Sequence, residues 1–167
     1  MDYIIREMKE FEYYLLDLFL YEAIFQRDNT KLLPKDIILQ DDLQVYIKDF
    51  GTKVDDYCLC ADINGLVVGA VWVRNIQGFG SVDHKTPEFA ISVLKEYRNN
   101  GIGLSLMKQM LNTLKYKGYE RTSLAVQKDN YAVRLYQSVG FTIIDENNEE
   151  YIMIWNTDTQ NVSRETF

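Results

Sequence analysis

The sequence is poor in the residues on which metal centres and disulfide frameworks depend. Its 167 residues include one histidine, two cysteines and two prolines. On a strand, Cys58 and Cys60 would share one face with their Cα atoms roughly 6.5–7 Å apart, which fits a disulfide poorly. We interpret both as reduced thiols packed in the interior. The lone histidine, His84, lies in a polar stretch, so we expect no metal site.

Long apolar runs and an excess of basic charge are also missing. No segment approaches the ~18–20 apolar residues of a membrane-spanning helix. The opening MDYIIREMKE contains acidic residues and no apolar core, so we expect no signal peptide and a cytoplasmic location. The formal net charge of −7 argues against nucleic-acid binding and favours cationic partners such as amines. Acidic residues that could face such a partner are Asp41, Asp42, Asp55, Asp56, Asp83 and the turn 145–150.

The length of 167 residues predicts one domain over residues 1–167, and its polar end predicts a loosely held tail from 157. Asn64-Gly65 between two apolar runs indicates a β-hairpin, and the polar segment 77–86 is expected to be an exposed loop. The expected strands are 3–8, 57–62, 66–74, 89–93, 122–126, 142–144 and 151–155. The expected helices are 11–25, a second one within 31–50, 104–117 and 131–139. This order predicts a single mixed sheet covered by helices.

The segment 89–110 joins a predicted strand, a glycine-bearing turn and a helix. Such a turn leaves backbone N–H groups unpaired at the positive end of the helix, which favours phosphate. Gly101 and Gly103 permit close approach of a ligand, and Arg98 adds a full positive charge. The turn is not a nucleoside-triphosphate P-loop, because no Gly-Lys-Ser/Thr follows. It is not the dinucleotide fingerprint either, because Leu106 stands where the third glycine is needed.

The turn has the form Arg-x-x-Gly-x-Gly, and a second motif follows one strand later. Residues 130–141, NYAVRLYQSVGF, have the form N-x-A-x-x-L-Y-x-x-x-G-F. Together the two motifs resemble those of the GNAT superfamily of N-acetyltransferases, and the element order of residues 1–155 agrees with that family. Each motif also has a simpler interpretation. The first is typical of a glycine turn that caps a helix, and Gly140 with Phe141 is typical of a helix C-terminus.

The resemblance implies a fold and a co-substrate. The fold class would be α/β (α+β): a GNAT-type mixed, mostly antiparallel sheet of about seven strands, flanked by about four helices and splayed at its central strands. Acetyl-CoA would enter the gap as a co-substrate, without a metal. The residues implied to bind it are Ile91, Ser92 and Val93 along the pantetheine arm, Arg98, Asn99, Asn100, Gly101, Ile102 and Gly103 around the pyrophosphate, and Asn130 beside the pantetheine.

The resemblance also implies two catalytic residues. Tyr136 matches the family's tyrosine that faces the departing thiolate; the alternative is an aromatic residue on the buried face of its helix. Glu88 stands before the central strand, where some family members have a general base; the alternative is a solvated charge at the strand end. A base is needed because an amine acceptor is protonated at neutral pH. Lys95 stands where the family often has proline, a departure expected to affect loop stiffness.

The implied activity is transfer of an acetyl group to a primary amine by direct attack in a ternary complex. One alternative is a catalytically inactive CoA-binding or regulatory domain with the same fold. Another is a phosphate-binding α/β domain outside the family. The acceptor, a small-molecule or peptide amine, is not identified by any motif in the sequence. We expect neither nucleic acid nor a membrane as a partner, and a homodimer is one arrangement that the family allows.

Overall fold

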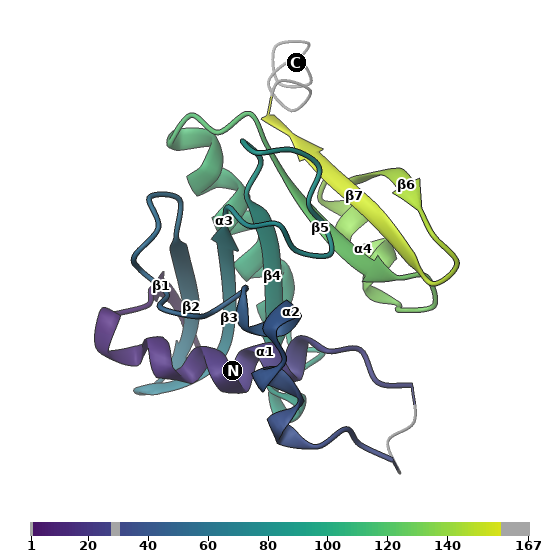
Figure 1. The fold of residues 1–167 in the computed structure, drawn as a ribbon. Coiled ribbons are helices and arrows are strands. Elements are labelled where there is room, and N and C mark those ends of the chain that lie inside the picture. The colour runs from purple at the N-terminus through teal and green to yellow at the C-terminus, as the bar shows by residue number, and fades with distance from the viewer. Residues whose placement is uncertain (1, 28–30, 158–167) are drawn as a thin grey trace.

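The computed structural model describes residues 2–27 and 31–157. One sheet of seven strands runs through this part of the chain in the order β1-β2-β3-β4-β5-β7-β6 (Figure 1). The strands are β1 (Ile4–Glu7), β2 (Tyr57–Ile63), β3 (Leu66–Arg74), β4 (Glu88–Val93), β5 (Arg121–Gln127), β6 (Thr142–Glu146) and β7 (Glu150–Asn156). Only β4 and β5 are paired in parallel among these strands. The predicted mixed, mostly antiparallel sheet is confirmed, and the predicted tail lies outside the described residues from 158 onward.

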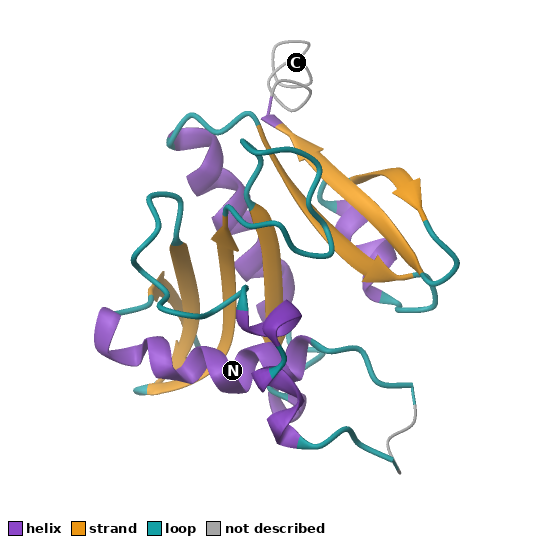
Figure 2. Ribbon diagram, in the orientation of Figure 1, coloured by secondary structure: helices purple, strands orange, loops and turns teal. Residues whose placement is uncertain are grey.

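Helices cover both faces of the sheet, as Figure 2 shows. The α-helices are α1 (Leu16–Ala23), α2 (Asp41–Gln44), α3 (Ile102–Tyr116) and α4 (Ala132–Ser138). The 3-10 helices are Glu10–Leu15, Lys35–Leu39 and Lys95–Tyr97. Helices α1 and α2 lie on one face, and α3 and α4 lie on the other. No helix within the described ranges is long and apolar enough to cross a membrane.

Each face of the sheet has its own apolar core. On one face, Leu106, Met110 and Leu114 of α3 are fully buried against the sheet, at the spacing of four residues typical of one helix face. On the other face, Phe19 of α1 packs with Trp72 of β3. Burial of each such side chain contributes about 1.5–3 kcal/mol. The two cores fix the helices on the sheet and therefore fix the turns between them.

The predicted helix 11–25 is divided in two. Residues Glu10–Leu15 form a 3-10 helix, and the α-helix begins only at Leu16. The Glu12 carboxylate accepts hydrogen bonds from the Lys9 N–H at 2.9 Å and from the Arg6 guanidinium at 2.8 Å. These contacts tie the first turn to β1. A contact between elements, which periodicity does not report, therefore sets the helix start.

The predicted second helix within 31–50 is much shorter than expected. Only the four residues of α2 are α-helical, between a 3-10 helix and a series of turns. The carbonyl of Tyr46 accepts a hydrogen bond from the Trp72 indole at 3.2 Å, and the carbonyl of Val45 accepts one from Arg74 at 3.1 Å. Both carbonyls would bond within the segment if the helix continued. Their bonds to β3 hold the segment against the sheet instead.

The two cysteines lie on β2 and are free and buried, as predicted. Cys58 is 1% exposed and Cys60 is fully buried. Burial raises the pKa of both thiols, which keeps them in the neutral form. They act as small apolar side chains of the core under α1.

The sheet opens at its centre. Strands β4 and β5 share a single register pair, Glu88 with Ser123. Next to this pair, the carbonyl of Pro87 accepts the Ser123 N–H at 3.1 Å and the Thr122 hydroxyl at 2.8 Å. Beyond it the two strands separate, so the predicted splay at the central strands is confirmed. This gap leaves one edge of β4 without a neighbouring strand.

Candidate functional site

The gap exposes backbone hydrogen-bonding groups of β4. The N–H of Leu94 donates to the carbonyl of Val68 at 2.9 Å. In an antiparallel pair, alternate residues face the partner strand, so the even-numbered residues of β4 direct their N–H and C=O groups toward β3. Ile91 and Val93 direct theirs into the gap. An extended ligand could therefore pair with β4 at these two residues as an additional strand would.

Ser92, between them, has its polar groups occupied. Its backbone faces β3 as the partner of Ala70, and its hydroxyl donates to the carbonyl of Phe19 in α1 at 2.7 Å. The resemblance implies a pantetheine contact for its backbone, but the alternation of the strand turns that backbone away from the gap. The role implied for this strand stays a prediction for Ile91 and Val93.

The turn after β4 presents the N-terminus of α3 to the same gap. Asn99 and Gly101 have φ angles of 64° and 79°, the left-handed conformation that lets the chain reverse into the helix. The first intrahelical bond joins the Ser105 N–H to the Gly101 carbonyl at 3.0 Å. The N–H groups of residues 102–104 therefore have no intrahelical acceptor. With the positive end of a 15-residue helix, they favour a bound anion such as phosphate.

Gly103 is a glycine that the fold itself does not require. Its φ is not positive, and a Cβ atom placed on it would meet only the Val93 side chain, at the ordinary contact distance of 3.8 Å. A helical position with room for a methyl group favours alanine over glycine by about 0.5–1 kcal/mol. The missing side chain leaves room for a ligand to approach the first turn of α3 closely.

Two cationic side chains stand beside this turn. The Arg98 Nε donates to the carbonyl of Val93 at 2.8 Å, and its Nη2 lies 3.4 Å from a carboxylate oxygen of Glu22. The Arg98 side chain remains about one-third exposed. Lys95 also lines the site, and it was not among the predicted residues. Its positive charge next to a phosphate-type turn was the sequence feature that could have indicated it.

The second motif places an amide and a phenol on the other side of the gap. The Asn130 Oδ1 accepts the Ala132 N–H at 2.9 Å, which starts α4 and leaves the Nδ2 donor available. The Tyr136 ring lies edge-on to Phe89 and Phe141, with centroids 6.5 and 5.6 Å away. Among the described residues nothing accepts or donates a hydrogen bond at its hydroxyl. Burial raises the pKa of Tyr136, so the phenol stays protonated and can donate.

These groups surround one cavity of about 720 Å³, a volume typical of small-molecule sites. Two of the predicted residues do not line it. One is Asn100, whose amide donates to the carbonyls of Tyr97 and Arg98 at 3.1 Å; the other is Glu88. The predicted residues that do line it are Ile91, Ser92, Val93, Arg98, Asn99, Gly101, Ile102, Gly103, Asn130 and Tyr136.

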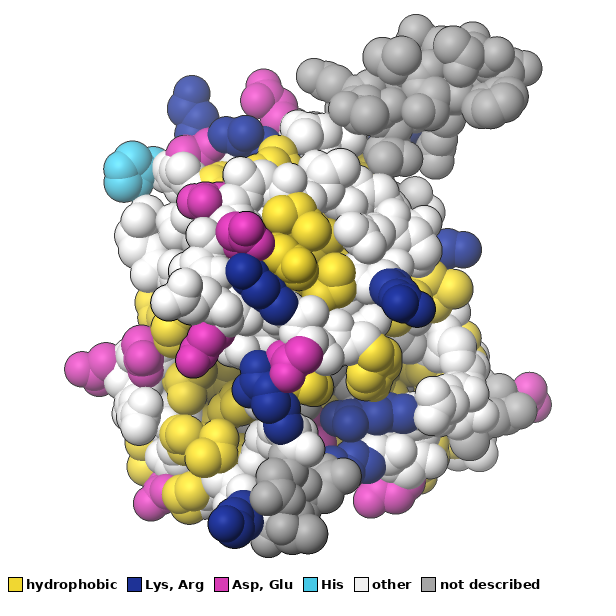
Figure 3. Space-filling view, turned by 90° about the vertical axis from the view of Figure 1, so that its right-hand side faces the viewer, with side chains coloured by type: hydrophobic (Ala, Val, Ile, Leu, Met, Phe, Trp, Pro, Cys, Tyr) yellow, Lys and Arg dark blue, Asp and Glu magenta, His cyan; other side chains and the backbone are white. Residues whose placement is uncertain are grey.

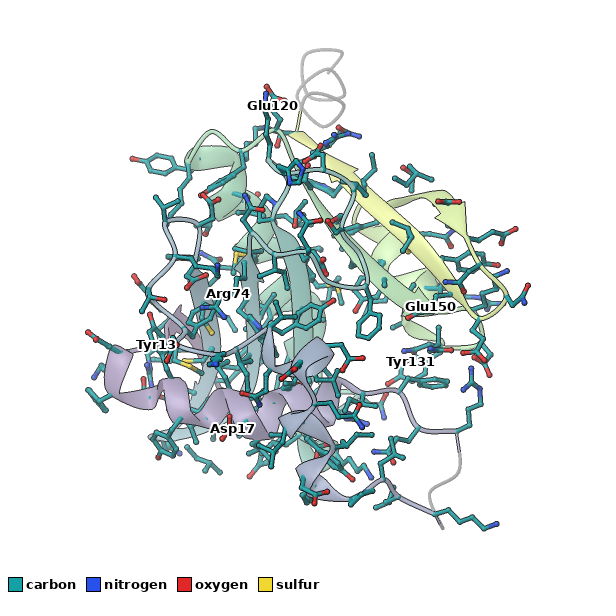
Figure 4. The ribbon with its side chains drawn as sticks, in the orientation of Figure 1. Tyr13, Asp17, Arg74, Glu120, Tyr131 and Glu150 are labelled. Carbon is teal, nitrogen blue, oxygen red and sulfur yellow. The ribbon has the colours of Figure 1, made fainter. Side chains whose placement is uncertain are left out.

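A third wall of the cavity, residues 21–26, was not predicted. It comes from the end of α1 and the segment after it, which Figure 4 shows passing close to Tyr131 at the start of α4. Arg27 forms an ion pair with Asp129, with Nη2 and Oδ1 2.6 Å apart, and also donates to Gln127 at 2.9 Å. These contacts join partners about a hundred residues apart in the chain. No local sequence pattern reports them.

Glu88 is buried at the closed end of the gap, and only 2% of it is exposed. Its carboxylate accepts hydrogen bonds from the Tyr46 hydroxyl at 2.7 Å and from the N–H groups of Gly78 and Gly80 at 2.8 and 3.2 Å. Burial raises the pKa of Glu88, and these three hydrogen bonds partly offset that effect. The interpretation of Glu88 as a solvated charge at the strand end is therefore wrong.

Some of the acidic residues proposed to face a cationic partner are engaged elsewhere. Asp56 is buried in an ion pair with Arg74, which Figure 4 labels, with Nε and Oδ1 3.0 Å apart, and Asp83 pairs with Arg121. Acidic and basic side chains are interspersed on the face shown in Figure 3. Within the described ranges, no group of three or more histidine, cysteine, aspartate or glutamate side chains is placed to hold a metal ion.

Comparison with known proteins gives the family and the fold. The model of the Acetyltransferase (GNAT) family matches residues 7–141. Among solved structures, a GNAT-family acetyltransferase from Streptococcus pneumoniae is 25% identical, with a TM-score of 0.65 over 93% of this chain and 99% of that one. Comparison with curated protein sequences gave no match.

Two further structures have bound ligands and show likeness of fold alone. The PaiA N-acetyltransferase of Thermoplasma acidophilum, in complex with coenzyme A, is 17% identical with a TM-score of 0.67, over 93% of this chain and 99% of that one. YncA of Salmonella typhimurium, with its cofactor acetyl-CoA, is 18% identical with a TM-score of 0.64, over 93% of this chain and 94% of that one.

Proposed function

Because this chain belongs to the GNAT family of acetyltransferases, we propose that it transfers an acetyl group from acetyl-CoA to a primary amine by direct attack in a ternary complex. The observation that carries the proposal is the arrangement of the cavity. An unpaired strand edge, a free helix N-terminus and a phenol donor all face one space of about 720 Å³. Gly103 adds a position where a side chain would fit the protein but would obstruct a phosphate.

The chain's own groups would divide the binding of acetyl-CoA between them. The N–H groups of residues 102–104, with Arg98 and Lys95, suit the pyrophosphate. Ile91 and Val93 suit the pantetheine arm, because their backbone groups point into the gap; the Val93 carbonyl there also accepts a hydrogen bond from Arg98. The Asn130 amide retains a donor on the opposite side. The ligands of the two structures with bound CoA or acetyl-CoA support the same choice of co-substrate here.

When bound, acetyl-CoA supplies a thioester whose carbonyl carbon is open to attack by an amine. As the C–N bond forms and the C–S bond breaks, negative charge grows on sulfur, and the Tyr136 hydroxyl donates a hydrogen bond to it. The amine must lose a proton before attack and another as the amide forms. Glu88 is the proposed proton acceptor. It would act through a water molecule, because its carboxylate is buried and does not line the cavity. The departing thiolate takes up a proton to leave as CoA.

The proposal is tested by binding and turnover with separate readouts. Thermal unfolding is measured with acetyl-CoA, with CoA and with ATP as a phosphate-containing control. We expect a rise in melting temperature with the first two that saturates with concentration. CoA release is then followed with a panel of polyamines, aminoglycosides, amino acids and peptides, and the acetylated product is identified by mass spectrometry.

The outcomes separate the alternatives. Binding of acetyl-CoA without turnover of any amine would favour a CoA-binding domain without catalysis. No stabilisation by either CoA compound would contradict the assignment of the cavity. Acetylation of a hydroxyl or thiol in preference to every amine would support acyltransferase activity but overturn the proposal that the acceptor is an amine.

A further inference from the structure

Glu88 is placed where the two halves of the sheet separate. It is the first residue of β4, and it forms with Ser123 the single register pair between β4 and β5. Ile91, which lines the cavity, is three residues further along the strand, or about 10 Å. A loop fixed by Glu88 is therefore fixed close to the place where acetyl transfer is proposed.

The loop held by Glu88 contributes three consecutive backbone N–H groups. The N–H of Gly78 donates to one carboxylate oxygen of Glu88 and the N–H of Gly80 to the other, at 2.8 and 3.2 Å. Between them, the N–H of Phe79 donates to the Tyr46 hydroxyl at 2.9 Å, and this hydroxyl donates to Glu88 at 2.7 Å. The Glu88 carboxylate accepts three of these bonds, from Gly78, Gly80 and Tyr46, whereas the NH₂ group of a glutamine side chain could accept none.

The two glycines of the loop are closely packed. A Cβ atom on Gly78 would lie 2.5 Å from the Tyr46 hydroxyl oxygen and 2.8 Å from a Glu88 carboxylate oxygen. A Cβ atom on Gly80 would lie 2.6 and 2.7 Å from backbone atoms of Leu124 and Ala125 on β5. The loop is thus packed against β5 on one side of the gap and bonded to β4 on the other. It bridges the two strands at the closed end of the gap.

Phe79, at the tip of this loop, is held with an exposed ring. It stacks on the Tyr46 ring, with centroids 6.4 Å apart and planes 12° from parallel, yet 49% of the residue is exposed. A half-exposed aromatic ring is ordinarily free to turn on a polar loop. Here hydrogen bonds fix the backbone on both sides of it, and stacking on Tyr46 restricts rotation of the ring. It does not line the cavity described above.

We propose that Glu88 is a positioning residue: with Tyr46 it holds the loop Gly78–Gly80, so that Phe79 forms an apolar wall at the Glu88 end of the gap. The acceptor amine must approach this end to reach the proton acceptor proposed above. The acceptor would accordingly be an amine that carries an aromatic or other apolar group. This inference rests on the proposed function, since it assigns the acceptor of that reaction. It is consistent with Asp56 and Asp83 being engaged in ion pairs rather than available for a polycation.

Two readouts test the proposal. The first is hydrogen exchange at the amides of Gly78–Gly80, which does not depend on activity. We expect exchange at least ~10-fold faster in Glu88→Gln and in Tyr46→Phe, because each change removes an acceptor of these N–H groups. Tyr116→Phe, at a residue that is 93% exposed on α3, is the matched control and should leave the rates unchanged. Unchanged rates in Glu88→Gln and Tyr46→Phe would overturn the positioning role.

The second readout is acceptor preference, measured with phenethylamine and ethylamine, which share the amine and differ in the ring. We expect wild type to prefer phenethylamine in kcat/KM, and Phe79→Ala to reduce that preference by ~10-fold through KM, with acetyl-CoA affinity unchanged. Phe79→Tyr should retain the preference. Glu88→Gln and Tyr46→Phe should share the KM defect, while a loss confined to kcat in Glu88→Gln would indicate a proton acceptor only and overturn the proposal.

Failure of the proposed function would look different. If no amine is acetylated, both the proposed reaction and the proposed contact of Phe79 with the acceptor are overturned. The hydrogen-exchange rates would still show whether Glu88 holds the loop Gly78–Gly80. If ethylamine is acetylated as efficiently as phenethylamine, the reaction stands and the apolar wall is overturned.

Discussion

Replacement of Tyr136 by phenylalanine isolates one hydroxyl group in the proposed reaction. The ring packs edge-on to Phe89 and Phe141, and both contacts remain in the variant. No described residue forms a hydrogen bond with the hydroxyl, so its removal leaves no partner unsatisfied. We therefore expect the free energy of unfolding to change by less than ~0.5 kcal/mol and the melting temperature by about 1–2 °C at most.

The expected effect on turnover follows from the charge that develops on sulfur. A thiol titrates near ~8.5 and a phenol near ~10, so full proton transfer from an unperturbed tyrosine is uphill by roughly 2 kcal/mol. Burial raises the pKa of Tyr136 further and makes full transfer less favourable still. A hydrogen bond that strengthens as the C–S bond breaks has no such obstacle. Loss of this donor should lower kcat by ~10–10³-fold, or about 1.4–4 kcal/mol of barrier, with acetyl-CoA affinity within a few-fold of wild type.

The assay follows the thiol of released CoA with a thiol-reactive reagent. The protein's own cysteines are buried and free, so they should react slowly and give little background. Tyr116→Phe removes the same hydroxyl at an exposed site outside the cavity and should match wild type. Single-turnover measurements establish that chemistry, and not product release, is observed. A phenylalanine variant with the wild-type single-turnover rate would show that Tyr136 is only a packing residue.

Two further predictions concern the turn between β4 and α3 and the ion pair that ties the first 3-10 helix to β1. Gly103→Asp places a negative charge in the first turn of α3, which favours the free helix but repels phosphate. The melting temperature without ligand should not fall, and the rise caused by acetyl-CoA should be lost. Gln109→Glu, which adds the same charge later in α3, should keep that rise; a rise retained in Gly103→Asp would contradict the assignment. The Arg6 guanidinium holds the pKa of Glu12 at about 2, below its ordinary value of 4.5. The stabilisation is therefore fully present above pH ~4.5 and lost as the pH falls through about 2. Glu12→Gln should lower the urea midpoint at pH 7 and approach wild type near pH 2, with Glu10→Gln as the exposed control. A midpoint difference that persists at low pH would refute this.

Local patterns in the sequence sufficed for most elements of the fold. The hairpin at Asn64-Gly65 is present, with φ angles of 51° and 93° at the two residues, because this dipeptide tolerates the left-handed conformation that such a turn requires. The spacing of apolar residues in α3 was equally sufficient, because one face of that helix is buried along its length. The two motifs indicated the glycine turn before α3 and the tyrosine that lines the cavity with it, since each motif is contiguous in the chain.

The tertiary structure decided what lies between distant segments. The short α2 and the delayed start of α1 result from bonds to β3 and β1 that no periodicity contains. The cavity wall at residues 21–26 and the burial of Glu88 likewise depend on contacts between distant segments. The position of Glu88 at the start of the central strand was readable from the sequence. Its burial under Tyr46 and the Gly78–Gly80 loop was not, because these partners lie 42 and 8–10 residues away. Alternation along a strand is local, but the environment of each face depends on which distant segments pack against it.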